Sequence, residues 1–437
     1  MSEALLVAAV PLLAAALLGF VPVRSGAWIG LGAAVIAFAL ACRAAAGVSD
    51  ADALGTVLAL LAAFVGATTA WFAVHDVPPD SRRARAANAL FQAMLGGALL
   101  ATLADDLALG WIGLALGTAA AAATVAGSES GWRSLIVLGT ALTLSLFGIV
   151  ALQVALPAAG WAGLASAAPG AQPAMLNLAA CFLLAGWGTL AALVPLHSWL
   201  PAMQAEAGVT SGVLSMLLTN AALANLLRLR VVMAACPGAL APGWALVLFG
   251  LLSVLGGALL LPRERTAPRL LAMSTVGQGG LAAVAFGLGG AAVLAGVLHL
   301  VLHTLSKAAL WQGIGRTEPP GGIWRTLRPT AWLVGAAGLA VAGVPPAGVF
   351  ASEFLVLTEA MRQAPVVAIL AGSGVVLGAG ALLTRLQALL LAPAVQGMAP
   401  PPKPWASFGA WVNLALALVL GLAMPEPVLL LLRAAAR

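Results

Sequence analysis

Residues 293–311 read VLAGVLHLVLHTLSKAALW, an apolar run long enough to cross a bilayer as one helix. His299, His303 and Lys307 lie four residues apart in this run, so they share one face of the helix. Ionisable side chains inside a membrane are costly, and they usually face the protein interior and mark an ion or proton path. Imidazole titrates near neutral pH, so the row predicts a proton relay. The alternative is that three polar groups simply hold neighbouring helices together.

Composition predicts an all-α polytopic membrane protein. Hydrophobic residues make up 62% of the 437 residues, charged residues only 8%, and the mean hydropathy is +1.07. The apolar runs are continuous rather than alternating, which argues against a transmembrane β-barrel. The three cysteines are far apart and form no CxxC, so neither a disulfide framework nor a metal site is expected. The basic residues are scattered through short loops, which does not favour nucleic-acid binding despite a pI of about 10.5.

Apolar segments run from one end of the chain to the other and predict about fourteen transmembrane helices. The N-terminus lacks a basic region before its apolar run and reads as a first span rather than a cleaved signal. The expected spans are residues 3–21, 27–46, 54–75, 87–104, 107–126, 133–156, 176–199, 209–235, 243–261, 268–288, 291–314, 331–357, 365–392 and 406–432.

The charge of the loops predicts an orientation. Lys and Arg cluster after the third, fifth, ninth, eleventh and thirteenth spans, whereas the loops after the fourth, sixth and tenth carry none. Basic loops stay in the cytoplasm, so both termini are expected outside. Arg228 and Arg230, at the end of the eighth span, fall on the wrong side for this rule, which suggests that they are buried in protein.

Two spans are expected to be broken, near Thr210–Ser215 and at Pro345–Pro346. Proline removes a backbone donor, and freed backbone groups at membrane depth must face protein or a water-filled cavity. Matching breaks are typical of inverted repeats. We therefore expect N-terminal helices in 1–86, two inverted five-helix repeats in 87–235 and 236–392, and a C-terminal helix in 393–437.

Five stretches, in collinear order, resemble motifs of the antiporter-like membrane subunits. They are LADDLALGWIGLAL (103–116), LVPLHSWLPAMQAEAGVTSGVLSMLLTNAALANLLRL (193–229), RLLAMSTVGQGGLAAVAFGLGG (269–290), HLVLHTLSKAALWQGIG (299–315) and GVPPAGVFASEFLVL (343–357). That family includes proton-pumping subunits of respiratory complex I, hydrogenase-4 component F, multisubunit cation/proton antiporters and the membrane subunit of a bicarbonate-accumulating complex. The VLSMLLTNAALANLLR and ASEFLVL stretches lean toward hydrogenase-4 component F. STVGQ and HLVLH lean toward the complex I and bicarbonate-pump branches, so the branch stays open.

The chain departs from the resembled pattern at two linked places. Ala115, after Trp111, stands where the family has a glutamate in the fifth span, and Leu190 stands where it has a lysine in the seventh. In the family these two form an ion pair thought to gate the first half-channel. Losing one partner would strand a buried charge at about 3–5 kcal/mol, whereas losing both is close to neutral. The first half-channel is therefore expected to be inactive, unless the alignment is offset by one turn.

The remaining relay candidates lie mostly in the second half. The row His299, His303 and Lys307 is joined by Gln278 and Ser274 on the preceding span, and by Glu353 after the proline break. The resemblance adds Arg385, which could equally extend from the helix end toward the cytoplasmic surface. It also adds His197 in PLHSWLP.

Three functions remain open at this stage. The first is a proton-translocating subunit of a larger complex I-like or hydrogenase-like assembly in a bacterial inner membrane, or of an inorganic-carbon accumulating complex. The second is a degenerate, non-pumping structural subunit, and the third an independent secondary transporter of protons or Na⁺. The sequence carries no flavin, haem, iron–sulfur or nucleotide motif, so no cofactor is expected and any redox chemistry would belong to partner subunits.

Overall fold

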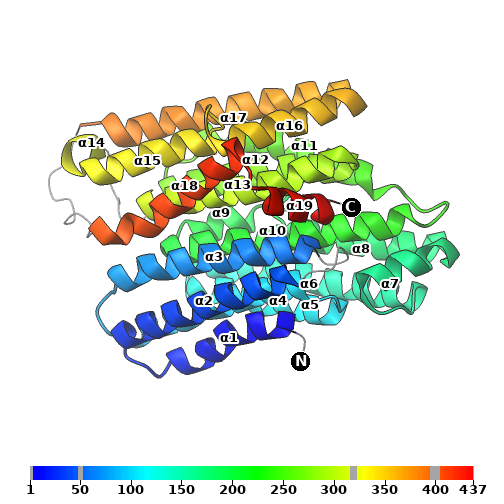
Figure 1. The fold of residues 1–437 in the computed structure, drawn as a ribbon, viewed down its shortest axis with the longest axis horizontal. Helices are drawn as coiled ribbons and strands as arrows, with labels where there is room; N and C mark the ends of the chain where they lie inside the picture. The colour runs from blue at the N-terminus through cyan, green and yellow to red at the C-terminus, as the bar shows by residue number, and fades with distance from the viewer. Residues whose placement is uncertain (1–2, 48–52, 315–321, 394–403, 437) are drawn as a thin grey trace.

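The computed structural model describes residues 3–47, 53–314, 322–393 and 404–436, and the regular structure within these ranges is helical (Figure 1). Twelve helices in this part of the chain are long and apolar enough to cross a membrane. The elements are α1 (Glu3–Leu18), α2 (Val23–Ala46), α3 (Ala53–His75), α4 (Arg82–Leu103), α5 (Leu107–Thr124), α6 (Glu129–Ala155), α7 (Gly160–Ala167), η2 (Ala168–Gly170), α8 (Pro173–Leu190), α9 (Trp199–Gln204), α10 (Gly208–Ala234), α11 (Pro242–Leu260), η3 (Leu261–Arg263), α12 (Ala267–Leu288), α13 (Ala291–Ile314), α14 (Ile323–Thr326), α15 (Arg328–Val341), α16 (Gly348–Gln363), α17 (Pro365–Leu391), η4 (Pro404–Ser407), α18 (Phe408–Leu422) and α19 (Glu426–Ala435).

Every predicted span contains a helix, because an apolar run in hydrocarbon must satisfy its backbone groups within itself. Most spans coincide with one helix to within a few residues, as α13 does with 291–314. The predicted spans 331–357 and 406–432 are instead split into α15 and α16, and into α18 and α19. In the predicted span 176–199 the helix α8 ends at Leu190, and the short helix α9 begins only at the last residue of the span. The short helix α7 was not predicted.

The predicted break near Thr210–Ser215 is wrong, because α10 is continuous there. Its small polar residues do not open the helix, since their hydroxyls bond back to the preceding turn, as Ser215 Oγ does to Gly212 O at 2.8 Å. The first break lies one span earlier, between α8 and α9, where Pro195 follows a cis peptide bond. The predicted break at Pro345–Pro346 is confirmed, and that bond is also cis.

Both breaks end their first helix with the same hydrogen bonds. After α8, Ala192 N donates to Thr189 O at 2.9 Å and Leu193 N to Gly188 O at 3.0 Å. After α15, Gly343 N donates to Ala340 O at 3.2 Å and Val344 N to Leu339 O at 3.1 Å. In each pair the two bonds span three and five residues, which is the Schellman closure of a helix C-terminus. Ala192 and Gly343 occupy its left-handed position, with φ of 55° and 66°.

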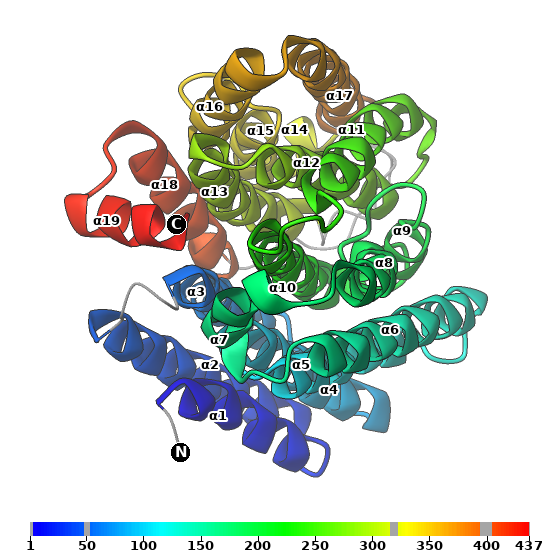
Figure 2. The same cartoon turned by 90° about the vertical axis from the view of Figure 1, so that its right-hand side faces the viewer.

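The helices form two five-membered units with matching neighbours. In the first unit α4 packs on α5 and on α10, and α6 packs on both parts of the broken span α8–α9. In the second unit α11 packs on α12 and on α17, and α13 packs on both parts of α15–α16. Five crossings separate each member from its counterpart, so the two units run in opposite directions. α10 also contacts α12 and α13, and it lies between the units in Figure 2.

The loops gather at two ends of the bundle. We call one end the basic face, because Arg82 at the start of α4, Arg133 near the start of α6 and Arg265 after η3 lie there. Hydrogen bonds between loops hold this face together. Asp80 accepts from Val23 N and from Arg85, and the Arg85 hydrogen bond is the main cause that lowers the pKa of Asp80. The other end, which we call the opposite face, carries the loops before α7 and α11.

The left-handed position in the first break generates a stability prediction. A non-glycine residue in that conformation costs about 1–2 kcal/mol, and glycine in the unfolded chain costs roughly 0.5–1 kcal/mol in entropy. Ala192→Gly should therefore raise the midpoint of thermal unfolding of the purified chain, by a net gain of up to about 1 kcal/mol. Ala191→Gly is the matched control, since Ala191 has an ordinary φ of −74° and the change should be destabilising. Equal destabilisation by both variants would contradict the assigned closure.

Candidate functional site

The row of ionisable residues on α13 lies in the protein interior, as its spacing predicts. His299 and Lys307 have no exposed surface, and His303 is 5% exposed. The imidazole rings of His299 and His303 are stacked, with centroids 5.8 Å apart and an interplanar angle of 14°. α13 is surrounded by α12, α15, α16, α18, α3 and α10, which explains how charged residue types can occupy a membrane-spanning helix without contacting lipid.

Two consecutive residues of α16 connect this row to α12. Ser352 Oγ lies 3.0 Å from His299 Nδ1, and the Glu353 carboxylate accepts a hydrogen bond from Gln278 Nε2 at 2.9 Å. Ser352 was not among the predicted site residues. Its position beside Glu353 in the ASEF motif was the available signal, but the partner on α13 lies 53 residues away in the sequence.

The break before α16 determines where Glu353 can lie. Its carboxylate packs directly against the backbone of Gly343, in the space that a side chain at that position would fill. Gly343 thus serves two needs, because its φ of 66° also favours glycine. Glu353 is 5% exposed, so the broken helix holds a carboxylate inside the bundle beside a hydrogen-bond donor.

Several polar atoms of the site have no hydrogen-bond partner among the described residues. They are Lys307 Nζ, His303 Nε2, His299 Nε2 and Gln278 Oε1, each with almost no exposed surface. A buried polar group without a partner costs roughly 1–3 kcal/mol, and more if it is charged. Such atoms are usually satisfied by ordered water, so the site is suited to a short water chain.

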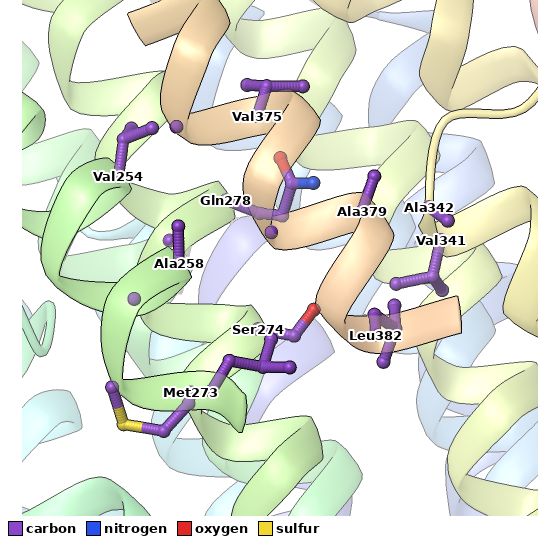
Figure 3. A pocket seen from close by; sticks show the side chains of 15 residues that line it. Val254, Ala258, Met273, Ser274, Gln278, Val341, Ala342, Val375, Ala379 and Leu382 are labelled. Carbon is purple, nitrogen blue, oxygen red and sulfur yellow. The ribbon is translucent and has the colours of Figure 1, made fainter. Parts of the chain in front are cut away.

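A small cavity adjoins the α12 end of the site (Figure 3). It lies between α11, α12, α15 and α17, and Ser274 and Gln278 are its polar side chains. Its volume is about 30 Å³, and one water needs roughly 10–15 Å³, so about two waters fit. Ser274 and Gln278 are four residues apart on one helix face, and Gln278 connects the cavity to the Glu353 carboxylate by its hydrogen bond.

A second polar contact ties α13 to the first unit. Asn220 Nδ2 on α10 donates to Thr304 Oγ1 at 2.8 Å, and both residues are buried. Thr304 follows His303 directly, so a link between the two units lies beside the middle of the row of ionisable residues. Thr304 was not predicted, because threonine is common in membrane helices and its partner is remote in sequence.

Two predicted relay residues are not joined to this group by any described contact. A guanidinium nitrogen of Arg385 donates to the backbone oxygen of Glu264 at the basic face, where it anchors the loop after η3. His197 lies in the first break, half-buried, and its Nδ1 has no partner in the described part of the chain. His197 therefore remains a candidate belonging to the first unit, and Arg385 has a structural contact of its own.

The first unit lacks ionisable residues where the second has them. α5 and α8 contain no Asp, Glu, Lys, Arg or His. Leu190 is 1% exposed and belongs to the hydrophobic core, and Ala115 is partly buried. Trp111 Nε1 donates instead to Leu142 O at 2.9 Å. In the described residues no cluster of three or more His, Cys, Asp or Glu side chains is placed to hold a metal ion.

Comparison with known proteins assigns the chain to a family. The family model described as NADH:quinone oxidoreductase/Mrp antiporter, TM, matches residues 107–378, which include both breaks and the whole α13 row. The chain belongs to this family. It is therefore a multi-pass membrane protein with the antiporter-like subunit fold.

Relatives and solved structures agree with this assignment. The chain is 35% identical over 370 residues to a hydrogenase-4 component F homolog from Methylacidiphilum infernorum, covering 77% of each chain. It is 28% identical over 356 residues to NADH-quinone oxidoreductase subunit L from Mycobacterium tuberculosis, covering 75% of this chain and 54% of that protein. A chain of respiratory complex I from Thermus thermophilus with bound aureothin superposes with a TM-score of 0.83 at 25% identity, covering 99% of this chain and 100% of that one.

The apolar surroundings of Leu190 can be tested by introducing a charge. Leu190→Lys should destabilise the purified chain by several kcal/mol, because the ammonium would be buried without a counter-charge. Leu190→Met, which conserves volume and polarity, should cost under about 1.5 kcal/mol. Ala115→Glu should also be destabilising. Thermal unfolding in detergent measures these effects, and full tolerance of Leu190→Lys would mean that this position is hydrated.

Proposed function

We propose that the chain is the antiporter-like, proton-translocating membrane subunit of a larger energy-coupled complex of the complex I-like or hydrogenase-like type. The family membership and the relatives named above support the class of assembly. The sequence has no redox-cofactor motif of its own, so the energy source would be the chemistry of partner subunits. In a bacterial inner membrane, the basic face would be exposed to the cytoplasm and both termini would lie on the periplasmic side.

One observation carries the proposal, the connected polar path in the second unit. Ser274 and Gln278 share the cavity, Gln278 donates to Glu353, and the adjacent Ser352 lies against His299. His303 and Lys307 continue the row at one-turn intervals of about 5.4 Å. Direct proton transfer needs heavy atoms about 2.6–3.2 Å apart, so water or reorienting side chains would bridge the remaining gaps.

Protons would move along this path by binding to side chains and water in turn. The His299 ring can accept a proton on one nitrogen and release one from the other, which suits a group between Ser352 and His303. Glu353 can exchange a proton with a water molecule that enters from the cavity, while Gln278 orients its carboxylate by a hydrogen bond. In the first unit the equivalent route would be interrupted, because α5, α8 and α9 contain no ionisable residue and those of α6, Glu129 and Arg133, lie in its first two turns.

Replacing Lys307 tests the path against a structural role. Lys307→Met keeps volume but removes the proton-binding group, so it should abolish proton uptake by proteoliposomes that hold the intact complex, while assembly is retained. His303→Ala should do the same. Ser306→Ala, a buried neighbour on the same helix, is the matched control and should pump normally. Equal pumping by Lys307→Met and wild type would reject the relay and favour a scaffold subunit.

Replacing Glu353 on α16 and Arg385 on α17 in turn tests which of the two lies on the path. Glu353→Gln keeps the shape and one acceptor oxygen but cannot carry a proton, so proton uptake should fall to background. Arg385→Gln removes a cation whose described contact is a loop carbonyl, so it should lower stability slightly and leave proton uptake intact. The reverse result would mean that proton uptake requires Arg385 and not Glu353.

A non-pumping structural subunit is the second candidate, favoured by the paired absence at Ala115 and Leu190. The proteoliposome measurement separates it from the first. Copurification identifies the complex, because a hydrogenase-like, quinone-reductase-like or zinc carbonic-anhydrase-like partner would each indicate a different assembly. A chain that purifies alone and exchanges protons or Na⁺ by itself would contradict the proposal and indicate an independent transporter.

A further inference from the structure

The two arginines near the end of α10 differ in how the protein satisfies them. Arg228 donates to Thr102 O at 2.9 Å and to Asn225 Oδ1 at 3.2 Å, and its guanidinium lies 5.8 Å from the centre of the Trp161 ring. Arg230 has one hydrogen bond to a described residue, from Nε to Gly287 O at 3.3 Å. The two terminal nitrogens of Arg230 therefore lack a partner within the described part of the chain.

Arg230 lies at a cavity of about 350 Å³ on the opposite face. The ends of α10, α11, α12 and α16 enclose this cavity. Its lining includes Cys236, Trp244, Gly287 and Gln363, and none of the lining residues is acidic. A half-buried guanidinium in a cavity without a carboxylate attracts an anion, and the planar fork of arginine suits the oxygens of a phosphate group.

Glycines in the backbone around Arg230 leave the space that the guanidinium occupies. Gly289, with a φ of 79°, lies directly beneath it, where any side chain would collide with the guanidinium. Gly243 lies at the start of α11, and a Cβ there would be 2.5 Å from Gly287 O. The contact with Gly289 and the hydrogen bond from Nε to Gly287 O restrict the guanidinium before any ligand arrives, which lowers the entropic cost of binding.

The residues at the opening of this cavity indicate which kind of molecule carries the anion. Trp244 and Leu240 line the cavity and are 62% and 59% exposed, and Leu248, one turn further along α11, is 56% exposed. Exposed tryptophan at the end of a membrane-spanning helix is typical of the headgroup region. Acyl chains could lie along the apolar surface of α11 while the phosphate contacts Arg230.

We propose that this cavity binds the phosphate headgroup of an anionic phospholipid in the leaflet at the opposite face. The guanidinium of Arg230 supplies the charge-assisted hydrogen bonds, and Trp244 and Leu240 contact the glycerol and the upper acyl chains. The site explains why an arginine is retained on the face that otherwise carries few basic residues. It does not depend on proton translocation, so the two proposals can fail separately.

Binding of phosphatidylglycerol to the delipidated full chain in detergent tests the site, with native mass spectrometry as the readout. Arg230→Gln should weaken binding about tenfold, corresponding to one charge-assisted hydrogen-bonded pair. Arg362→Gln is the matched control. It removes the same charge near the same face, but Arg362 is exposed and paired with Glu359 at 2.8 Å, so binding should be unchanged.

Two further experiments distinguish a phospholipid headgroup from free inorganic phosphate as the ligand. Trp244→Ala should weaken phosphatidylglycerol binding and leave any binding of inorganic phosphate unchanged. If inorganic phosphate protects the chain from thermal unfolding as well as phosphatidylglycerol does, the site takes a soluble anion and the lipid proposal is wrong. Wild-type affinity in Arg230→Gln would also overturn it. If Arg230→Gln does not fold, Arg230→Lys replaces it, and unchanged affinity in that variant would reject recognition by the guanidinium fork.

Discussion

The need to satisfy every backbone polar group inside a hydrocarbon layer controls this structure. An unpaired amide or carbonyl there costs several kcal/mol, so a spanning helix can stop at membrane depth only if its end is closed by other bonds. Both breaks meet this need with the same Schellman closure, at Ala192 and at Gly343. The closed ends allow α9 and α16 to begin inside the protein, and they position His197 in one unit and Ser352 and Glu353 in the other.

The two units share this backbone solution but differ in the side chains attached to it. In the second unit the break holds Glu353 against Gly343 and places it beside Gln278. In the first unit the closing helix ends at Leu190, a core residue. Because a buried ion pair is close to neutral for stability, both of its members can be replaced by apolar residues without loss of the fold. The fold therefore does not depend on whether a unit carries proton-binding groups. Each unit can gain or lose such groups independently of the other.

The sequence was sufficient for the helices and for the face of α13 that carries the ionisable row, because hydropathy and a four-residue spacing are local signals. It failed for the first break. The small polar residues of the segment Thr210–Ser215 looked like an interruption, but a hydroxyl such as that of Ser215 can bond within its own helix, whereas Pro195 cannot donate at all. It also missed the His299–Ser352 and Asn220–Thr304 contacts, which join residues 53 and 84 positions apart. Such pairs depend on which helices become neighbours, and no local pattern encodes that.

The distribution of unsatisfied polar atoms separates the scaffold from the site. Among the described residues, half of the buried side-chain atoms without a partner lie on α13, although it is one helix of many. Native proteins satisfy most buried polar groups, and the exceptions usually require an explanation such as water, an ion or catalysis. Apolar residues at these positions would pack at least as well, since α13 is enclosed by other helices on most sides. The proposed relay would account for His299, His303 and Lys307 at that cost, whereas packing alone would be served by leucine.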